Sequence, residues 1–380
     1  MPSRPQPYRQ LPSERPDALA PVHALKGRGT AWAIEHRFTR QAHEAFDDGW
    51  GLLDQQTGEE TLPPQTQFIE ENARSIIARN DSPDVPFDHS INPYRGCEHG
   101  CIYCFARPTH SYLNLSPGLD FESKIIVKVN AVERLREELA RRAYVPRSIN
   151  LGAATDAYQP VERKLGITRR LIEVLAECRH PFSVVTKSSG VERDIDLIAP
   201  MAAKRMAGVF VSVTTLDASL ARVLEPRAAA PHRRLRTVEA LARAGIPVGV
   251  SCAPIIPFIN EPEIEKLVEA AAGAGACHVS WVLLRLPWEV NPLFKQWLQQ
   301  HFPLRANRVM ARLQETRGGK DYDADFGTRM KGEGTWAQFV QQRFDKAIAR
   351  AGLNRQRFEF DHTQFRRPQP PGAGVQGTLF

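Results

Sequence analysis

Three cysteines lie close together in the segment NPYRGCEHGCIYCFARPTH, where Cys97, Cys101 and Cys104 are separated by three and then by two residues. Three thiolates from one short loop can converge on a single inorganic centre, and soft sulfur ligands favour iron–sulfur clusters, zinc or copper(I). On a 4Fe–4S cube, three cysteines would leave one iron without a protein ligand, which is a reactive position. The spacing therefore predicts a metal centre here, with Gly96 and Gly100 allowing the backbone to wrap closely around it.

A structural zinc site is the alternative for the same loop, with His99 or His110 as the fourth ligand. Such sites usually pair two CxxC-like segments, and the chain has no second one. The other cysteines are scattered. We expect Cys178, which closes a helix, and Cys277, which opens a strand, to be small buried residues, whereas Cys252 at a strand end stays open to a role in the site.

The composition is that of a globular protein. The chain has 380 residues, 42% of them hydrophobic and 24% charged, and a formal net charge of +7, which argues against a disordered chain, a coiled coil or a collagen-like fibre. No run of residues approaches the roughly 20 apolar residues of a membrane span, and the N-terminus has no apolar signal core. We therefore expect a cytoplasmic protein without a membrane partner, in which the six cysteines do not form disulfides.

Short apolar runs alternate with amphipathic windows from about residue 87 onward, a pattern typical of successive βα units around a parallel sheet. Six strands are expected: the segment just before the cysteines, then 148–153, 182–186, 208–214, 246–252 and 277–284. Helices are expected at 131–143, 168–178, 192–204, 232–244 and 262–272, with an extra strand at 121–130. Six parallel strands fit an open doubly wound sheet or an incomplete barrel. In both folds, ligands gather at the carboxyl ends of the strands.

The rest of the chain divides around this core. Residues 1–86 are expected to form an N-terminal extension, partly irregular, with one helix around Trp32–Ala45, and residues 87–290 to form the core. Helical periodicity at 291–365 predicts a C-terminal helical region that caps the core. Residues 366–380 are rich in Pro and Gly and are expected to be a flexible tail.

The pattern CxxxCxxC, with Tyr103 just before the third cysteine and βα units after it, resembles the radical SAM superfamily. This resemblance implies an α/β fold with a partial (β/α)6 barrel, a 4Fe–4S cluster on Cys97, Cys101 and Cys104, and S-adenosylmethionine (SAM) bound at the open iron. It also implies reductive cleavage of SAM to a 5′-deoxyadenosyl radical that abstracts hydrogen from a substrate. A reducing partner such as flavodoxin or ferredoxin would supply the electron.

The stretches VVTKSSG and VSVTTLD are similar to the spore photoproduct lyase subgroup. That similarity implies that Lys187 contacts the SAM carboxylate and Ser212 the ribose, roles that suit an ammonium and a hydroxyl. Where the superfamily often has a Gly-Gly-Glu-like stretch for the SAM amino group, this chain has LGAATDAYQP. Gly152, Thr155 and Asp156 are then the candidates for that contact, with helix N-capping as the alternative for Asp156.

The chain departs from this subgroup at two positions. The subgroup transfers hydrogen through a cysteine near the end of the second strand and a tyrosine after the third cluster cysteine. This chain has Ala154 or its neighbours at the first place and Phe105 at the second. We therefore do not expect the same repair reaction. The whole chain looks more like an uncharacterised bacterial group of radical SAM proteins.

An arginine-rich segment is a candidate surface for nucleic-acid phosphates, although charged runs more often form a solvated helix face. Its members, with only two glutamates among them, are Arg222, Arg227, Arg233, Arg234, Arg236 and Arg243. The leading hypothesis is a radical SAM enzyme that acts on an unidentified substrate, with nucleic acid a candidate and lyase, transferase and oxidoreductase reactions all open. The alternatives are a nucleic-acid-binding protein with a structural metal and an iron–sulfur protein for electron transfer or sensing.

Overall fold

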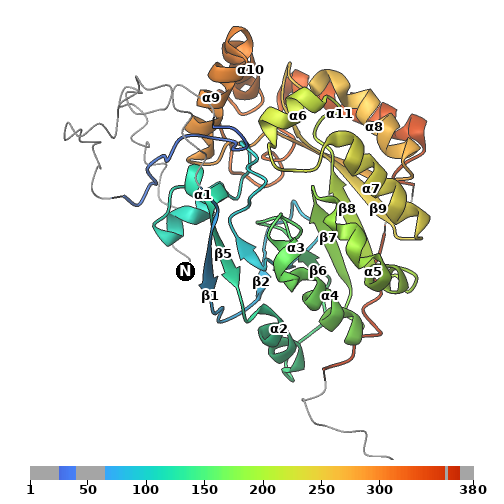
Figure 1. Cartoon of the computed structure of the whole chain (residues 1–380). Coiled ribbons are helices and arrows are strands. Elements are labelled where there is room, and N and C mark those ends of the chain that lie inside the picture. Colours follow the sequence, from blue (N-terminus) through green and yellow to red (C-terminus); the bar gives the residue numbers. More distant parts are fainter. Residues whose placement is uncertain (1–24, 40–64, 356–357, 369–380) are drawn as a thin grey trace, which may run out of the picture.

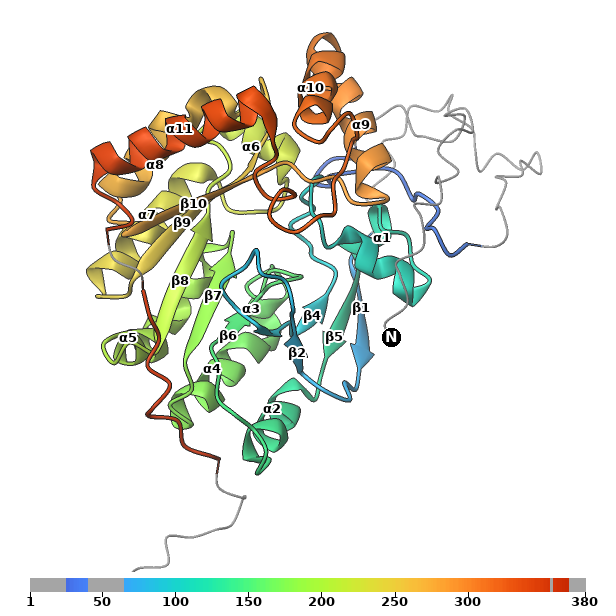
Figure 2. The same ribbon diagram turned by 180° about the vertical axis from the view of Figure 1, so that it is seen from behind.

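The computed structural model describes residues 25–39, 65–355 and 358–368. Its main sheet has the strand order β10-β9-β8-β7-β6-β3-β2 (Figures 1 and 2). The strands are β2 (Ile77–Arg79), β3 (His89–Ile91), β6 (Ile149–Leu151), β7 (Phe182–Thr186), β8 (Ala207–Ser212), β9 (Val248–Ile255) and β10 (His278–Leu283). Strands β3, β6, β7, β8, β9 and β10 run parallel, and β2 runs antiparallel to β3. The expected set of six parallel strands is confirmed, in an open sheet with β10 and β2 at its edges.

The parallel strands are apolar on both faces because helices cover both faces. In the register of the sheet, Val184 of β7 lies beside Leu151 of β6 and Val209 of β8, and all three are fully buried. The covering helices are α2 (Ala131–Ala140), α4 (Ile167–Glu177), α5 (Ile195–Ala202), α7 (Pro231–Arg243) and α8 (Ile264–Gly273), at the expected positions. Short helices fill the connections: α1 (Leu119–Ser123), α3 (Glu162–Leu165), α6 (Ala218–Leu224), and the 3-10 turns η1 (Arg107–Leu113), η2 (Ser189–Asp194) and η3 (Glu261–Glu263).

The carboxyl ends of the parallel strands point to the top of the molecule in Figure 1. Helix α6, which follows β8, lies at that end, whereas α5, which precedes β8, lies at the opposite end (Figure 1). A smaller sheet of β1 (Gln67–Glu71), β5 (Lys124–Lys128) and β4 (Tyr94–Arg95), in the order β1-β5-β4, stands beside the main sheet. Strand β5 confirms the extra strand expected at 121–130, and β4 leads directly into the cysteines.

Three C-terminal helices, α9 (Val290–His301), α10 (Pro303–Glu315) and α11 (Gly334–Ala351), match the helical region expected after residue 290. Helices α9 and α10 lie at the carboxyl end of the sheet, whereas α11 lies alongside α8 (Figures 1 and 2). Trp281 of β10 stacks on Phe344 of α11, with ring centroids 4.9 Å apart. Beyond α11, the Arg366 amide bonds to the Cys178 carbonyl at 2.8 Å, and residues 369–380 lie outside the described residues.

The helix expected around Trp32–Ala45 is wrong for the part that the structure describes, because residues 25–39 form no helix or strand. Their backbone bonds to distant parts of the chain instead. The Trp32 carbonyl accepts from the Leu119 amide at 3.0 Å, and the Ile34 carbonyl accepts from the Ser116 hydroxyl at 2.7 Å. Positions 40–45 lie outside the described residues. None of the helices that the structure describes is both long and apolar enough to cross a lipid bilayer.

Candidate metal centre and cofactor site

The three cysteines lie on one loop between β4 and η1. Cys97 and Cys101 are buried, and Cys104 is partly buried. The amide of Gly100 donates to the Cys97 carbonyl at 3.3 Å, and the amide of Cys104 donates to the Cys101 carbonyl at 3.2 Å. Gly96 and Gly100 have φ of +79° and +66°, a conformation that other residues adopt only with strain. The loop is therefore tightly turned, as the positions of its glycines predicted.

Burial disfavours the thiolate form of two of these cysteines. It raises the pKa of Cys97 well above the ordinary value, and the nearby charges of Asp156, Cys101 and Cys104 raise it further. Burial also raises the pKa of Cys101 to about 12, with Lys187 opposing the rise. A bound metal supplies the positive charge that holds buried cysteines as thiolates. The chemistry of this donor set therefore fits a metal centre.

The histidines of the zinc alternative are engaged elsewhere. His110 Nε2 donates to the Lys124 carbonyl at 3.0 Å, and His99 Nδ1 lies 3.3 Å from Asp156 Oδ2. Within the part of the chain that the structure describes, no three His, Cys, Asp or Glu side chains are placed to share one metal ion. A cubic iron–sulfur cluster does not require its cysteines to share one metal ion, because each cysteine binds a separate iron.

Asp156 lies where the cysteine loop meets the ends of two strands, and its carboxylate already has protein partners. Its Oδ1 accepts from the Tyr158 amide and the Thr186 hydroxyl, both at 2.8 Å, and its Oδ2 accepts from the Lys187 amide at 2.7 Å. Burial alone would raise the pKa of Asp156, but the charge of His99 and these hydrogen bonds hold it at about 2. The contacts of Asp156 favour a positioning role over direct contact with a ligand.

Gly152 and Thr155 are also accounted for by local packing. Gly152 has a φ of +88°, and a Cβ on it would lie 2.9 Å from the Val185 carbonyl, so a side chain does not fit against β7. The Thr155 hydroxyl donates to the Gly96 carbonyl at 2.6 Å, and Gln159 Nε2 donates to the same carbonyl at 3.3 Å. The segment after β6 therefore fixes the beginning of the cysteine loop.

Lys187 directly follows β7, and its ammonium lies near the cysteine loop, with Nζ 5.8 Å from the centre of the Tyr103 ring. Burial lowers the pKa of Lys187, but the charges of Cys101 and Glu225 outweigh burial and raise the pKa above its usual value. Ser212 ends β8 and is buried, and its carbonyl accepts from Arg234 at 3.0 Å. Lys187 is thus a permanently charged group beside the cysteines, which suits the predicted contact with a carboxylate.

A buried polar network behind the loop was not predicted from the sequence. Glu225 accepts hydrogen bonds from Tyr103, Thr214 and Arg234, and Glu225 and Arg234 are almost fully buried. Burial raises the pKa of Glu225, but the charges of Arg234 and Lys187 outweigh it and hold the pKa at about 2. The only sequence signal was a pair of charged residues nine positions apart, which also fits a solvated surface.

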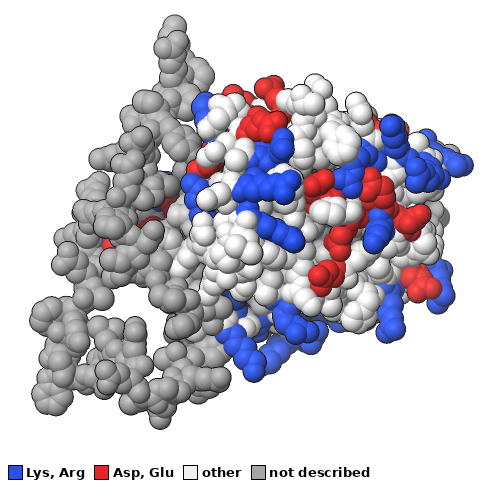
Figure 3. All heavy atoms as spheres, turned by 90° about the horizontal axis from the view of Figure 1, so that it is seen from above, with Lys and Arg blue, Asp and Glu red and all other residues white. Residues whose placement is uncertain are grey.

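The arginine-rich segment does not form one continuous basic surface. Arg227 pairs with Glu98, Arg233 with Glu192, Arg234 with Glu225 and Arg243 with Glu239, all in the part of the chain that the structure describes. Arg222 and Arg236 are exposed. Viewed from the carboxyl end of the strands, Lys and Arg side chains are interspersed with acidic ones (Figure 3). Most of the predicted patch therefore consists of ion pairs within the protein.

The remaining cysteines differ from one another in burial. Cys178 is buried, as expected, and Cys277 is exposed, so the expectation of burial is wrong for Cys277. Its thiol instead donates to the Val248 carbonyl at 3.3 Å. Cys252 is fully buried inside β9, where burial raises its pKa to about 12. It is therefore a small core residue.

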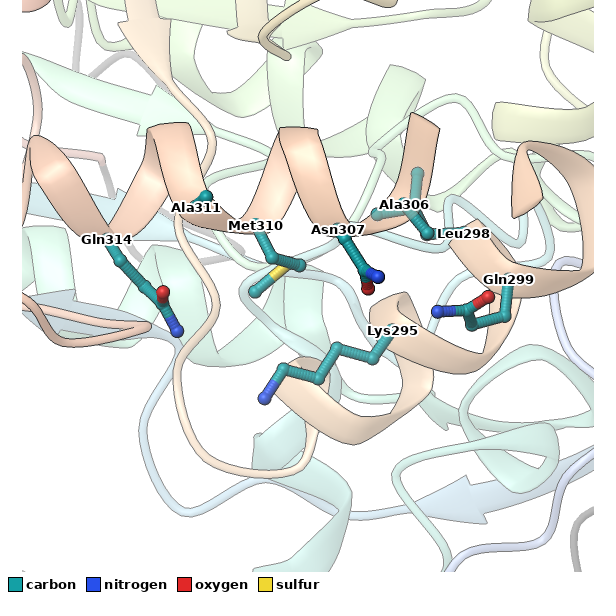
Figure 4. Close-up of a pocket in the computed structure, with 8 residues that line it drawn as sticks. All are labelled: Lys295, Leu298, Gln299, Ala306, Asn307, Met310, Ala311 and Gln314. Atoms are coloured by element: carbon teal, nitrogen blue, oxygen red, sulfur yellow. The ribbon is translucent and has the colours of Figure 1, made fainter. Parts of the chain in front are cut away.

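Two cavities lie apart from the cysteine loop. One, of about 300 Å³, lies between α9 and α10 (Figure 4), where Lys295 Nζ at its edge pairs with Asp321 at 2.7 Å. The other, of about 550 Å³, is lined by residues of β2, β3 and the end of α2. In the described part of the chain, neither is lined by a residue of the predicted cofactor site.

Comparison with known proteins identifies the domain that carries this loop. Residues 91–271 match the sequence model of the radical SAM superfamily. The chain contains a radical SAM domain. An uncharacterized protein of Mycobacterium bovis is 36% identical over 226 residues, which make up 59% of this chain and 66% of that protein. An uncharacterized protein of Methanocaldococcus jannaschii is 26% identical over 216 residues, or 56% of this chain and 76% of that protein. The chain thus spans just under two thirds of the mycobacterial relative.

Solved structures show the same fold for the radical SAM domain. A spore photoproduct lyase variant with bound AdoMet and dinucleoside spore photoproduct superposes with a TM-score of 0.52 at 17% identity, over 74% of this chain and 79% of that chain. A second variant of that enzyme gives the same TM-score at 18% identity. The predicted fold class is therefore confirmed, with a parallel sheet that remains open.

A radical SAM domain implies two cofactors, a 4Fe–4S cluster and SAM. The loop fits the first, because three cysteines of one tight turn are the soft ligands that iron–sulfur clusters use. Cys97, Cys101 and Cys104 are the residues that would hold it. The ammonium of Lys187, placed beside them, fits the second, because SAM carries a carboxylate.

Proposed function

We propose that the chain is a radical SAM enzyme that cleaves SAM reductively and abstracts hydrogen from a nucleic-acid substrate. The observation that carries this proposal is the location of three cysteines in one tight loop, with the charged Lys187 beside them at the carboxyl end of β7. The cofactors supply a radical, and the protein supplies binding, orientation and exclusion of water.

The side chains of the domain divide these tasks. Lys187 is proposed to neutralise the SAM carboxylate, and the Ser212 hydroxyl to bond with ribose oxygens. Asp156 is proposed to act indirectly, because it holds the Lys187 amide at 2.7 Å and lies 3.3 Å from His99 of the cysteine loop. A fixed carboxylate between these two elements sets the distance between the metal ligands and the SAM-binding lysine.

The reaction on the substrate is proposed to differ from lesion repair by spore photoproduct lyase. Ala154 packs next to the apolar group of Cys97, Ala106 and Phe121, and it has no thiol. Phe105 is 52% exposed and has no hydroxyl. Neither side chain can donate or accept the hydrogen atom that a thiol or phenol exchanges with a radical.

Nucleic acid is proposed as the substrate class on two grounds. The spore photoproduct lyase structure with a similar fold contains a dinucleoside spore photoproduct. In this chain, Arg222 and Arg236 are exposed on α6 and α7. Guanidinium groups bind phosphates through paired hydrogen bonds. A cytoplasmic location and a flavodoxin or ferredoxin as electron donor complete the proposal.

The test is anaerobic reconstitution of the full chain with iron and sulfide, reduction with dithionite, and measurement of 5′-deoxyadenosine formed from SAM. The proposal predicts that the wild-type protein forms 5′-deoxyadenosine and that Cys101→Ala abolishes both iron binding and SAM cleavage. Cys252→Ala is the matched control, because Cys252 is buried in β9 away from the loop, and it should keep both properties.

Other outcomes would favour the alternative functions. A cluster that forms without cleaving SAM would contradict the proposal and favour electron transfer or sensing. One zinc per chain, without iron or sulfide, would favour a structural metal. If Cys252→Ala lost SAM cleavage while Cys101→Ala kept it, the proposal that Cys101 binds the cluster would be wrong. Binding of single- and double-stranded oligonucleotides, weakened by rising salt, tests the substrate class.

A further inference from the structure

A buried ion pair next to the cysteine loop has no part in the proposed chemistry. Arg107, the first residue of η1, pairs with Glu122 of α1, and both side chains are fully buried. A buried pair of charges has a large desolvation cost and is often no more stable than apolar residues of the same size. The geometry that the pair imposes is therefore a better explanation of its burial than its contribution to stability.

All five N–H groups of the Arg107 guanidinium have acceptors. Nε donates to the Cys101 carbonyl at 2.9 Å, and Nη2 donates to the Gly100 carbonyl at 3.2 Å and to Glu122. Nη1 donates to the carbonyls of Gly118 at 2.9 Å and Pro117 at 3.3 Å. Arg107 thus joins the cysteine loop to segment 117–118 through a rigid fork that a lysine cannot reproduce.

Glu122 connects this pair to a segment that lies outside the matched domain. The amide of Gly29 donates to Glu122 Oε2 at 2.8 Å, and Arg28 Nη1 donates to the Glu122 carbonyl at 2.7 Å. We call residues 28–37 the strap. Its Trp32 carbonyl accepts from the Leu119 amide, and Arg37 pairs with the buried Glu289 at 2.9 Å. The strap is therefore held at several points along its length.

The strap, the cysteine loop and α1 with the segment before it lie so close together at three glycines that no side chain fits there. A Cβ on Gly29 would lie 1.8 Å from the Gly100 carbonyl oxygen, and a Cβ on Gly100 would lie 2.7 Å from Glu122 Oε2. A Cβ on Gly118 would lie 2.0 Å from the Trp32 carbonyl oxygen. Further along the strap, Ile34 is buried in the apolar group that contains Cys101 and Tyr103. The strap thus covers one side of the cysteine loop.

We propose that the strap and the Arg107–Glu122 pair clamp the cysteine loop in the shape that retains its metal centre and shield that side from solvent. Arg107, Glu122 and Gly29 are positioning residues, since they act through the loop and not on the cofactors. This inference rests on the proposed function only in assuming that the loop holds an iron–sulfur cluster.

Gly29→Ala tests the clamp. Gly29 does not have a φ in the left-handed region, so the added methyl group acts through contact with its neighbours, mainly the Gly100 carbonyl at 1.8 Å and also Glu122 Oε1 at 3.1 Å. Full-length protein is reconstituted anaerobically, and the iron lost to a chelator and the loss of cluster absorbance in air are followed over time. We expect comparable initial iron but release about tenfold faster, the lower end of the effect seen for groups that orient metal ligands. The low-temperature electron paramagnetic resonance (EPR) spectrum of the reduced cluster should also change.

Two further variants serve as a control and as a second test of the clamp. Gly273→Ala, at an exposed helix end where an added Cβ meets nothing within 4 Å, should release iron like the wild type. Arg28→Ala removes a strap anchor without adding a clash, and it should also release iron faster while its unfolding temperature stays close to that of the wild type. If Gly29→Ala does not fold, the iron release rate of Arg28→Ala becomes the test of the clamp.

Wild-type release rates in both Gly29→Ala and Arg28→Ala would overturn the clamp, as would equally fast release from Gly273→Ala. A wild-type protein that binds no cluster at all would instead contradict the proposed function. The two failures are therefore distinguishable in one set of measurements.

Discussion

Lys187 and Asp156 lie close together, but we expect substitutions of these two residues to impair different properties of the protein. Lys187→Met removes the only charge proposed to meet the SAM carboxylate and leaves the cysteine loop intact. A hydrogen bond to a charged group contributes about 1.5–3 kcal/mol, so SAM should bind roughly 10- to 100-fold more weakly. Equilibrium binding of SAM to the reconstituted protein measures this. The exposed Lys204 supplies the control, and Lys204→Met should bind SAM normally.

Asp156→Asn should instead weaken the retention of iron and the binding of SAM together. An amide cannot accept at both ends, whereas the carboxylate accepts from Thr186 and from the Lys187 amide at its two oxygens. Iron content and SAM affinity are measured on the same preparation. If SAM affinity alone falls, Asp156 is a direct SAM ligand, as the sequence predicted, and the positioning role is wrong.

His180 gives the fold a dependence on pH that is independent of the cofactor site. Its Nδ1 donates to the Pro181 carbonyl at 3.0 Å, and in the neutral ring Nε2 accepts from the Tyr144 hydroxyl at 2.7 Å. Burial lowers the pKa of His180 from 6.5 to about 4. The unfolded chain binds a proton at higher pH than the folded one, so His180 lowers stability as the pH falls from 6.5 toward 4.

His180→Gln should therefore show a smaller fall in unfolding temperature between about pH 7.5 and about pH 5.5 than the wild type does. Thermal unfolding at the two pH values measures it. His232 is exposed, and His232→Gln should keep the full wild-type fall. An equal fall in His180→Gln and the wild type would mean that protonation of His180 does not oppose folding.

Among the elements, α11 packs on the parallel sheet through a buried apolar face that includes an aromatic stack. Phe344 is fully buried, and its ring stacks on Trp281 of β10. Phe344→Ala should lower the free energy of unfolding by about 3–5 kcal/mol. Phe339, on the same helix, is 52% exposed, and Phe339→Ala should change it by no more than about 0.5 kcal/mol. Anaerobic chemical denaturation compares the two, and equal losses would show that α11 does not pack as described.

The elements also show what a sequence can and cannot predict. Strands such as β7 were predictable at their observed bounds, because in an α/β fold a continuous apolar run between two helices normally forms a buried strand of the parallel sheet. The strap could not be predicted from the sequence, since it forms no helix or strand and bonds to residues far away in the chain, such as Ser116 and Leu119. Local periodicity contains no information about such partners.

The site was predictable to a similar, limited extent. The cysteine loop follows from spacing alone, because its ligands are close in sequence. The pairing of Glu225 with Arg234, or of Arg107 with Glu122, does not, because charged residues are usually exposed and their burial depends on the assembled fold. For the same reason, the sequence alone does not show that four members of the arginine-rich segment form ion pairs within the protein.

In the molecule as a whole, we expect one loop, held between the strap and the ends of the parallel strands, to present a metal centre with an open position to SAM. EPR spectroscopy of the reduced, reconstituted protein with and without SAM tests this most directly. We expect the signal of a reduced 4Fe–4S cluster whose shape changes when SAM is added. Iron-free protein, or a cluster signal that SAM leaves unchanged, would contradict it.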